Sequence, residues 1–502
     1  MPEEQKNAGK PITIDISRGW LPDFLPNAVP IGGLLQALNL YPYDEKYYPA
    51  LNPVAYSSNT LSGTPIGSLE YYSNDGNYYV FCGTTTKLYR LETSLALADI
   101  TRAAGAYTSS TTRWYFTKKG ESVIATNYAD VPQRLTGMTS SNFVALGGSP
   151  PNAKFCLFFK GHLILAYLND GTVYPQKVIW SAWDSIADFA QSLTTGAGSR
   201  NLEDADGEIT GLTALGSMLL IFHRNSITVG WYSGGQFTFN LDSLRVRDKG
   251  AIEGTIIVFG NVCYFFDERD IYEMTADGII TPIGIGVKNT LLEDLDIGNF
   301  HRISTAADPR RGVVYWSYPS VSSDGTPDTI LAYNPKLKRF TKISLTHNGI
   351  FNMHKTILDA DSDALNDMFP DADSIVQEAD SSFWLDDSAI LACINSSSYV
   401  SQFSGDAMTW TIETSEFSYD DKIIAVLKLR PKVDQAPGNI SVQVGARFNE
   451  NEDRSYSDAV NVDVYGNAYP RKAGRYCTAL VSGGLCDGIS SINAEAAIIG
   501  SR

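Results

Sequence analysis

The sequence predicts an all-β protein, with a β-propeller-like main domain, an N-terminal extended arm and a C-terminal β-sandwich-like domain. From about Val54 onward, apolar or alternating runs of four to eight residues recur between Gly, Asn or Asp, which is typical of strands and hairpin turns. The hairpins return about every 40–50 residues, the length of one four-stranded blade. Helical patterns are confined to short amphipathic stretches at 183–193 and 290–300.

The extended arm is predicted over residues 1–53. Seven prolines between residues 11 and 53 exclude a long helix and leave room for one helical turn around Leu34–Leu38. The arm either lies across a neighbouring subunit or another protein, or packs on its own propeller. In the first case, removing residues 1–53 leaves a soluble β-rich monomer that no longer assembles. The candidate assembly contacts are its apolar and aromatic side chains: Trp20, Leu21, Phe24, Leu25, Tyr41, Tyr43, Tyr47 and Tyr48.

The propeller-like domain is predicted over residues 54–404. Hairpin turns are expected at 224–226, at Gly260-Asn261 and at 275–278, where residues that tolerate positive φ separate two apolar runs. A β-sandwich would also explain short strands, but more than 300 residues of them exceed one sandwich, and radial repetition limits exposed edges. An acidic insertion around 359–387 has ten carboxylates and neither Lys nor Arg.

The C-terminal domain is predicted over residues 405–502. Its runs, such as ISVQVGARF and AVNVDVYG, alternate apolar and polar residues at period two. This alternation indicates strands with one buried and one solvated face, as in a sandwich.

Composition narrows the classes of function. The 502 residues include 56 acidic and 39 basic side chains, a net charge of −17 that disfavours a tight grip on nucleic acid. No apolar run is long enough for a spanning helix, and the first residues do not have a signal-peptide pattern. Six scattered cysteines indicate assembly in a reducing cytoplasm. A Cys477–Cys486 pair is an open alternative to two reduced thiols.

The sequence does not have the usual patterns of catalytic residues. The five histidines form none of the usual zinc spacings, and the sequence has no nucleophile elbow or phosphate-binding glycine loop. Two aspartate-rich runs, 204–208 and 359–363, do not have the distal glutamate of a calcium loop. The tryptophans are interpreted as packing between blades, with sugar stacking as the alternative. We therefore expect no catalytic residues, no cofactor and no metal.

Five segments, in this order along the chain, resemble elements of the tail nozzle (tail hub, or stabilization) proteins of short-tailed, podovirus-type bacteriophages. The first is the opening DISRGWLP with NLYP. The second and third are VIWSAWDSIADF and GSMLLIFHRNSITVGWYSG. The last two are DPRRGVVYWSYP with ILAYNPKLKRFTKI, and KAGRYCTALV, which starts at Lys472.

This resemblance implies a structural virion protein and not an enzyme. It implies a homohexameric ring in the tail that extends the DNA ejection channel below the portal and the head-to-tail adaptor protein, and that anchors tail fibres or tailspikes. Viral DNA would pass through the lumen without specific binding, and the ring would be assembled in the host cytoplasm. The alternative is a propeller-based tail protein that binds or cleaves glycans with paired carboxylates at the propeller mouth.

Overall fold

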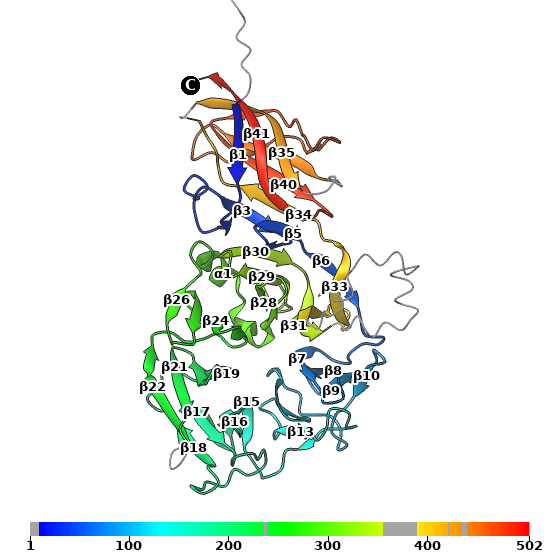
Figure 1. Ribbon diagram of the computed structural model, residues 1–502, viewed down its shortest axis with the longest axis vertical. Helices are drawn as coiled ribbons and strands as arrows, with labels where there is room; N and C mark the ends of the chain where they lie inside the picture. The colour runs from blue at the N-terminus through cyan, green and yellow to red at the C-terminus, as the bar shows by residue number, and fades with distance from the viewer. Residues whose placement is uncertain (1–9, 235–237, 355–388, 420–421, 434–438, 501–502) are drawn as a thin grey trace, which may run out of the picture.

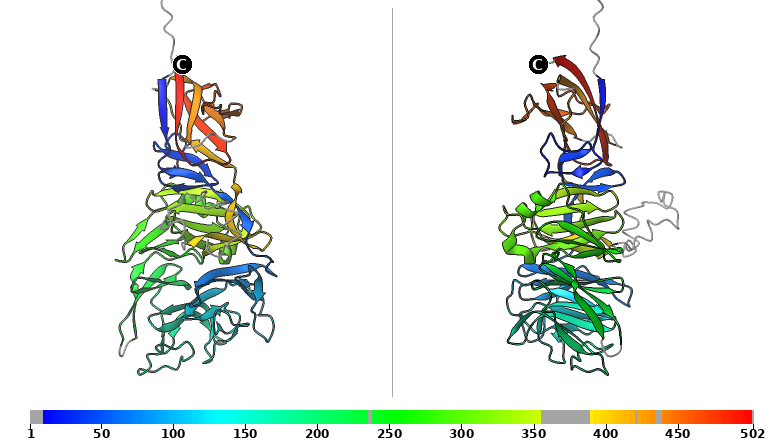
Figure 2. Two further views of the ribbon diagram at one scale, coloured as in Figure 1. Left: turned by 45° about the vertical axis from the view of Figure 1, so that its right-hand side comes forward. Right: turned by 90° about the vertical axis from the view of Figure 1, so that its left-hand side faces the viewer.

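The computed structural model describes residues 10–234, 238–354, 389–419, 422–433 and 439–500. The predicted acidic insertion at 359–387 lies outside these residues. The all-β prediction is confirmed: strands form a ring of four-stranded sheets with a second domain standing on one rim (Figure 1). Views from the side show the ring as a thick disc below the second domain (Figure 2).

The disc is a seven-bladed propeller. Six blades are separate four-stranded sheets, and the seventh is one end of an eleven-stranded sheet. Within each blade, successive strands pair antiparallel, and the first strands of consecutive blades contact one another around the ring. The first three blades are β7 (Pro65–Tyr72), β8 (Tyr78–Thr84), β9 (Leu88–Leu91) and β10 (Leu97–Asp99); β11 (Tyr115–Lys119), β12 (Ser122–Thr126), β13 (Gln133–Leu135) and β14 (Val144–Ala145); and β15 (Asn152–Phe159), β16 (His162–Asn169), β17 (Val173–Trp180) and β18 (Gly198–Asn201).

The ring is closed by a strand from the N-terminal side of the chain. This strand, β6 (Leu51–Ala55), pairs antiparallel with the third strand of the last blade and becomes its outer strand. The remaining blades are β19 (Ile209–Leu215), β20 (Met218–His223), β21 (Ser226–Tyr232) and β22 (Phe239–Arg247); β23 (Ile257–Phe259), β24 (Val262–Phe266), β25 (Ile271–Thr275) and β26 (Ile280–Pro282); β27 (Ser304–Asp308), β28 (Val313–Tyr318), β29 (Thr329–Asn334) and β30 (Arg339–Ser344); and β31 (His347–His354), β32 (Ala389–Asn395) and β33 (Val400–Ala407) with β6.

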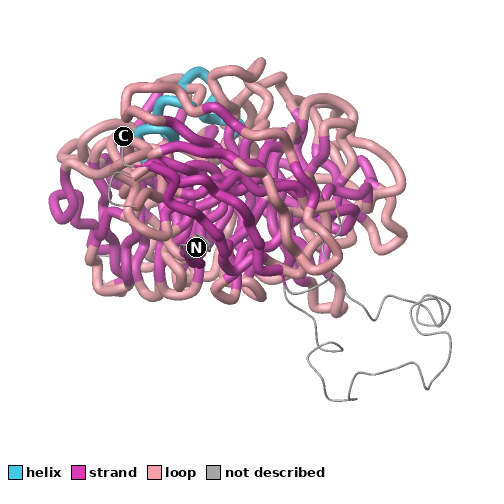
Figure 3. The backbone as a smooth tube through the Cα atoms, turned by 90° about the horizontal axis from the view of Figure 1, so that it is seen from above, coloured by secondary structure: helices cyan, strands magenta, loops and turns pink. Residues whose placement is uncertain are grey.

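Local signals in the sequence are confirmed at all three predicted turns. The turns at 224–225, 260–261 and 276–279 each connect two paired strands. The stretch 290–300 is helical, as α1 (Lys288–Asp294) and the 3₁₀ helix η1 (Ile297–Arg302), which gather at one edge of the molecule (Figure 3). The helix predicted at 183–193 is wrong, because Asp184 has a left-handed φ of 54° and the Ala182 N–H bonds the Asp188 carbonyl across a loop.

The second domain is a sandwich of two sheets built from both ends of the chain. One sheet, called the outer sheet below, has the order β39-β35-β41-β5-β4, with β1 paired to β41. The other, called the joined sheet, continues from β30 through β3, β34, β40 and β36. Their strands are β1 (Lys10–Asp15), β4 (Leu40–Tyr43), β5 (Lys46–Pro49), β35 (Ile423–Val433), β39 (Lys472–Gly474) and β41 (Ile489–Gly500); and β2 (Gly19–Trp20), β3 (Gly33–Leu38), β34 (Trp410–Thr414), β36 (Ser441–Arg447), β37 (Ser455–Tyr456), β38 (Val460–Asn461) and β40 (Tyr476–Gly483).

The N-terminal segment is extended, but the expectation of a separate arm is corrected. Strand β1 pairs with β41 from Lys10↔Ala496 to Asp15↔Ser491, and β3 pairs with β34. The helical turn for which the prolines leave room at Leu34–Leu38 does not form, because these residues belong to β3. The physical reason is burial: Leu34 is fully buried in the sandwich core, and a strand provides both that burial and backbone pairing on each side.

The joined sheet makes the two domains one mechanical unit. Leu38 of β3 pairs parallel with Lys342 of β30, and the Asn39 N–H donates to the Lys342 carbonyl at 2.7 Å. Gly19 has a φ of 81°, and a Cβ there would lie 3.0 Å from the Phe340 nitrogen, so this close approach requires glycine. A single apolar cluster runs from the propeller's Trp316 to the sandwich's Trp410.

Candidate assembly surface and propeller axis

Two of the predicted assembly contacts are core residues. Trp20 is 8% exposed and Tyr47 is fully buried, both within the cluster shared by the two domains. The Tyr47 hydroxyl donates to the Ile16 carbonyl at 2.8 Å, and burial raises the pKa of Tyr47 above its usual value. In this chain these two side chains therefore contact the chain's own core and are not available to a partner.

Three of the predicted tyrosines form a cluster on the β4–β5 hairpin, at the joint between the domains. Tyr41 and Tyr48 stack with ring centroids 5.8 Å apart, and Tyr43 lies 5.8 Å from Tyr48 at a tilt. The Arg311 guanidinium lies 4.6 Å from the centre of the Tyr41 ring. Burial raises the pKa of Tyr41, although Arg311 opposes this shift. Tyr43 is 38% exposed, so only the edge of this cluster reaches the surface.

The loop of residues 21–32 is fastened to the propeller. The Asp23 carboxylate accepts hydrogen bonds from the N–H groups of Asn289 and Thr290 at 2.9 and 2.8 Å, so it caps the first turn of α1 from 266 residues away. Leu21 and Phe24 close around Gly286, where a Cβ would come within 2.8 Å of either side chain.

Leu25 is the most exposed of the predicted contacts, and its own loop and the loop of residues 283–287 each hold a further exposed aliphatic residue. Leu25 is 72% exposed, Ile31 84% and Ile285 68%. These three residues are called the junction patch below. The sequence analysis missed Ile31 and Ile285. Ile285 lies in the GIG tripeptide 284–286.

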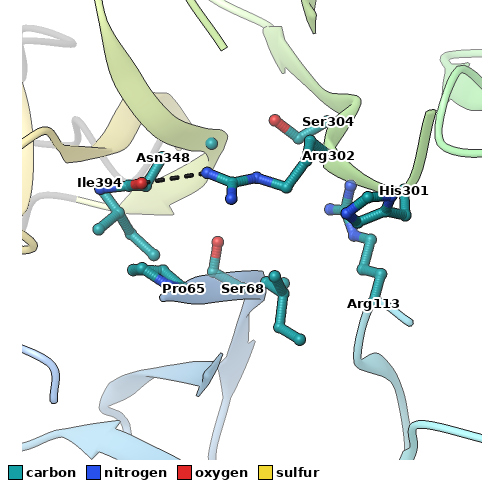
Figure 4. A pocket seen from close by; sticks show the side chains of 11 residues that line it. Pro65, Ser68, Arg113, His301, Arg302, Ser304, Asn348 and Ile394 are labelled. Atoms are coloured by element: carbon teal, nitrogen blue, oxygen red, sulfur yellow. Dashed lines mark hydrogen bonds between the residues drawn. The ribbon is translucent and has the colours of Figure 1, made fainter. Parts of the chain in front are cut away.

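Near the propeller axis, polar side chains from different blades contact one another. A cavity of about 10 Å³, room for roughly one water molecule, lies between β7, β27 and β31. Arg302 donates to the Asn348 amide oxygen at 3.2 Å across this cavity (Figure 4). Arg113, which lines the same cavity, donates to the Ile303 carbonyl. Burial lowers the pKa of His301, and the neighbouring Arg302 lowers it further.

A second set of polar contacts joins the first strands of two other blades to the segment between β22 and β23. Lys154 of β15 pairs with Glu253 at 2.6 Å, and the Tyr115 hydroxyl of β11 donates to the same carboxylate at 3.0 Å. Burial raises the pKa of Tyr115 well above its usual value, and Glu253 adds to this shift. These contacts tie together blades that are not adjacent in sequence, so the axis is a structural centre.

Histidine, cysteine and acidic side chains do not gather into metal-binding groups in the part of the chain that the structure describes. His162, His223 and His347 are buried, and each makes a hydrogen bond inside the propeller. Cys477 and Cys486 are both buried free thiols. Among the described residues, no helix is long and apolar enough to cross a membrane.

Comparisons with known proteins give neither a family nor a function. No family model and no curated protein matches the chain. Among solved structures, one described as YCF48 bound to D1 peptide is similar at 10% identity and a TM-score of 0.37, covering 60% of this chain and 86% of that one. The computationally designed Ika8 protein is similar at 11% identity and a TM-score of 0.34, covering 60% of this chain and 93% of the design.

Proposed function

We propose that this chain is a structural wall unit of the tail nozzle of a short-tailed bacteriophage. The proposal rests on the five collinear segments that resemble nozzle proteins and on one observation of the fold. That observation is the eleven-stranded sheet, which runs from a propeller blade into the sandwich without a flexible linker. Such a unit resists bending, as the wall of an ejection channel requires. In this proposal the chain forms part of that wall and catalyses no reaction.

The DNA channel of this assembly would lie between copies and not along the propeller axis. The Lys154–Glu253 and Tyr115–Glu253 contacts join different blades on the inside of the propeller. With 17 net negative charges per chain, a sixfold ring would carry about 100, which repels phosphates within a Debye length of about 8–10 Å. Viral DNA would therefore slide past this wall without binding to it.

The junction patch is the surface that we assign to permanent contacts in the ring. Its three exposed aliphatic side chains lie beside the rigid joint between the domains, where a neighbouring copy would hold both domains at once. Exposed aliphatic side chains that gather in neighbouring loops are a feature of interaction surfaces. The adaptor, and the fibres or tailspikes, would then contact the ring at its other faces, in the tail of the virion.

Electron microscopy of the purified protein tests the proposal. We expect rings with a central hole. We also expect Leu25→Glu/Ile285→Glu to give monomers, because a carboxylate would be buried at each contact. The matched control is Leu193→Glu, a position that is 73% exposed on the propeller, and it should still form rings. Monomers of the unmodified protein at every concentration would contradict the proposal, and glycan cleavage by the pure protein would favour the alternative.

A further inference from the structure

The outer sheet carries a groove of about 810 Å³ on its solvent face. Its floor is β35 and β41, which lie side by side (Figure 1). Lys428, Arg430 and Lys432 alternate along β35, and a strand directs alternate side chains to one face, so all three point into the groove. Asn493 of β41 lies directly opposite Arg430.

The wall of the groove is the turn of residues 463–467, which is fixed in place. The Asp463 carboxylate accepts hydrogen bonds from the N–H groups of Tyr465 and Asn467, each at 2.9 Å. Just beyond the turn, Ala468 exchanges two backbone hydrogen bonds with Leu429 of β35, at 2.8 and 2.9 Å. The groove is therefore preorganised, and a ligand would not bear the cost of ordering the wall.

The three cations of the floor differ in their partners. Lys428 pairs with Glu495 at 3.0 Å. Hydrogen bonds from the turn, and to a smaller extent Lys428, lower the pKa of Asp463, so this carboxylate also offsets the Lys428 charge. Arg430 and Lys432 have no ion-pair partner among the described residues. A negatively charged ligand group would therefore be drawn to these two side chains.

Two further features of the groove indicate what surrounds that charge. Ser490, Asn467 and Asn493 also line the groove and bring side chains that can form hydrogen bonds. These polar side chains fit a ligand that carries hydroxyl or N–H groups beside its anionic group. Tyr465 is 76% exposed at the rim and offers a flat ring for stacking.

We propose that this groove binds an acidic saccharide. A sugar carboxylate would form paired hydrogen bonds with the Arg430 guanidinium and a charge contact with Lys432. Sugar hydroxyls would form hydrogen bonds with polar side chains of the lining such as Ser490, and the apolar face of a sugar ring would stack on Tyr465. Inorganic phosphate fits less well, because it has no apolar face for the Tyr465 ring. The volume is in the range of small-ligand sites.

This binding role is independent of the ring proposed above, because the groove is complete within one chain. It also differs from a glycan site at the propeller mouth, since it lies on the sandwich. If the chain assembles but the groove binds no saccharide, only the groove proposal fails. If the chain is monomeric and binds the saccharide, only the ring proposal fails.

Titration of the full chain with tri-galacturonic acid, followed by calorimetry, tests the groove. The carboxyl methyl ester of the same trisaccharide keeps the sugar rings and hydroxyls but replaces each carboxylate with an uncharged ester, and it is the matched ligand. We expect saturable binding of the acid, and binding of the ester weaker by about tenfold or more, the loss expected for a charge-assisted hydrogen bond.

Variants distinguish binding by the groove residues from a general effect of the protein's net charge on ligand affinity. Arg430→Gln/Lys432→Gln should weaken binding of the acid by about tenfold or more. Lys336→Gln/Lys338→Gln makes the same change of net charge at an exposed propeller turn and should leave binding unchanged. Tyr465→Ala removes an exposed ring and should weaken the binding of acid and ester alike. Because this position is exposed, the variant still tests the groove if the double variant does not fold.

Three results would overturn the proposal. The first is the absence of saturable binding, and the second is equal affinity for acid and ester. The third is binding of an oligoglutamate peptide as tight as that of the trisaccharide, which would make the groove a docking site for acidic polypeptide instead.

Discussion

The propeller and the sandwich are both made of antiparallel strands, but they use the chain in opposite ways. In the propeller, strands that follow one another in sequence pair within one blade, and only β6 comes from elsewhere. In the sandwich, the first and last described strands pair with each other, as at Lys10↔Ala496. The propeller thus depends on local contacts, while the sandwich depends on pairing across nearly the whole chain. The two domains should therefore respond differently to changes at the ends of the chain.

Deleting residues 1–49 is expected to have the largest effect. It removes β1 to β5 from the sandwich and exposes the core around Trp410, while β6 still closes the propeller. We expect the chain to aggregate, in contrast to the soluble monomer that the sequence interpretation predicted. Soluble yield and amide hydrogen exchange measure this. Deleting residues 1–9 is the control, and a folded, soluble chain without residues 1–49 would contradict the shared core.

The same contrast explains how much of the fold could be predicted. Apolar runs and turns such as Gly260-Asn261 are local signals, so the hairpins and the blade rhythm could be predicted from the sequence. Pairing of β1 with β41 has no local signal, because its energy comes from contacts between residues more than 400 positions apart. Prolines between residues 11 and 53 correctly excluded a helix, but they do not reveal which strands become partners.

The candidate sites were harder to predict than the fold. The aromatic side chain of Tyr47 was predicted to make an apolar contact with a partner. It does make apolar contacts, but with the core of its own chain, where it is fully buried. The alternation of Lys428, Arg430 and Lys432 is visible in the sequence, whereas the wall of their groove comes from a turn some 35 residues later. A groove between distant segments leaves no pattern in either segment alone.

Removing one carboxylate from each domain should show that the Glu253 contacts near the propeller axis contribute more to the free energy of unfolding than the Glu495 contact beside the groove. Glu253→Ala leaves Lys154 without its partner and removes the acceptor of the Tyr115 hydroxyl, so we expect a loss of about 2–4 kcal/mol in the free energy of unfolding. Glu495→Ala removes a partner of Lys428 at an exposed site and should cost about 0–1 kcal/mol. Denaturant unfolding measures both, and equal losses would contradict a structural role specific to the axis.

Mild acid should weaken the propeller more than the sandwich, because all five histidines lie between residues 162 and 354. Burial lowers the pKa of His223 and His347 to about 4, against about 6.5 in the unfolded chain. Between these values the unfolded state binds more protons, so stability falls as the pH drops, by about 1–2 kcal/mol per histidine at pH 5. Hydrogen exchange at pH 7 and pH 5, corrected for intrinsic rates, should show faster opening in the blades. His223→Asn should reduce the pH dependence, since it removes one of the two groups. If hydrogen exchange rises equally in both domains at pH 5, groups other than the propeller's histidines cause the acid sensitivity. The same conclusion follows if His223→Asn leaves the pH dependence unchanged.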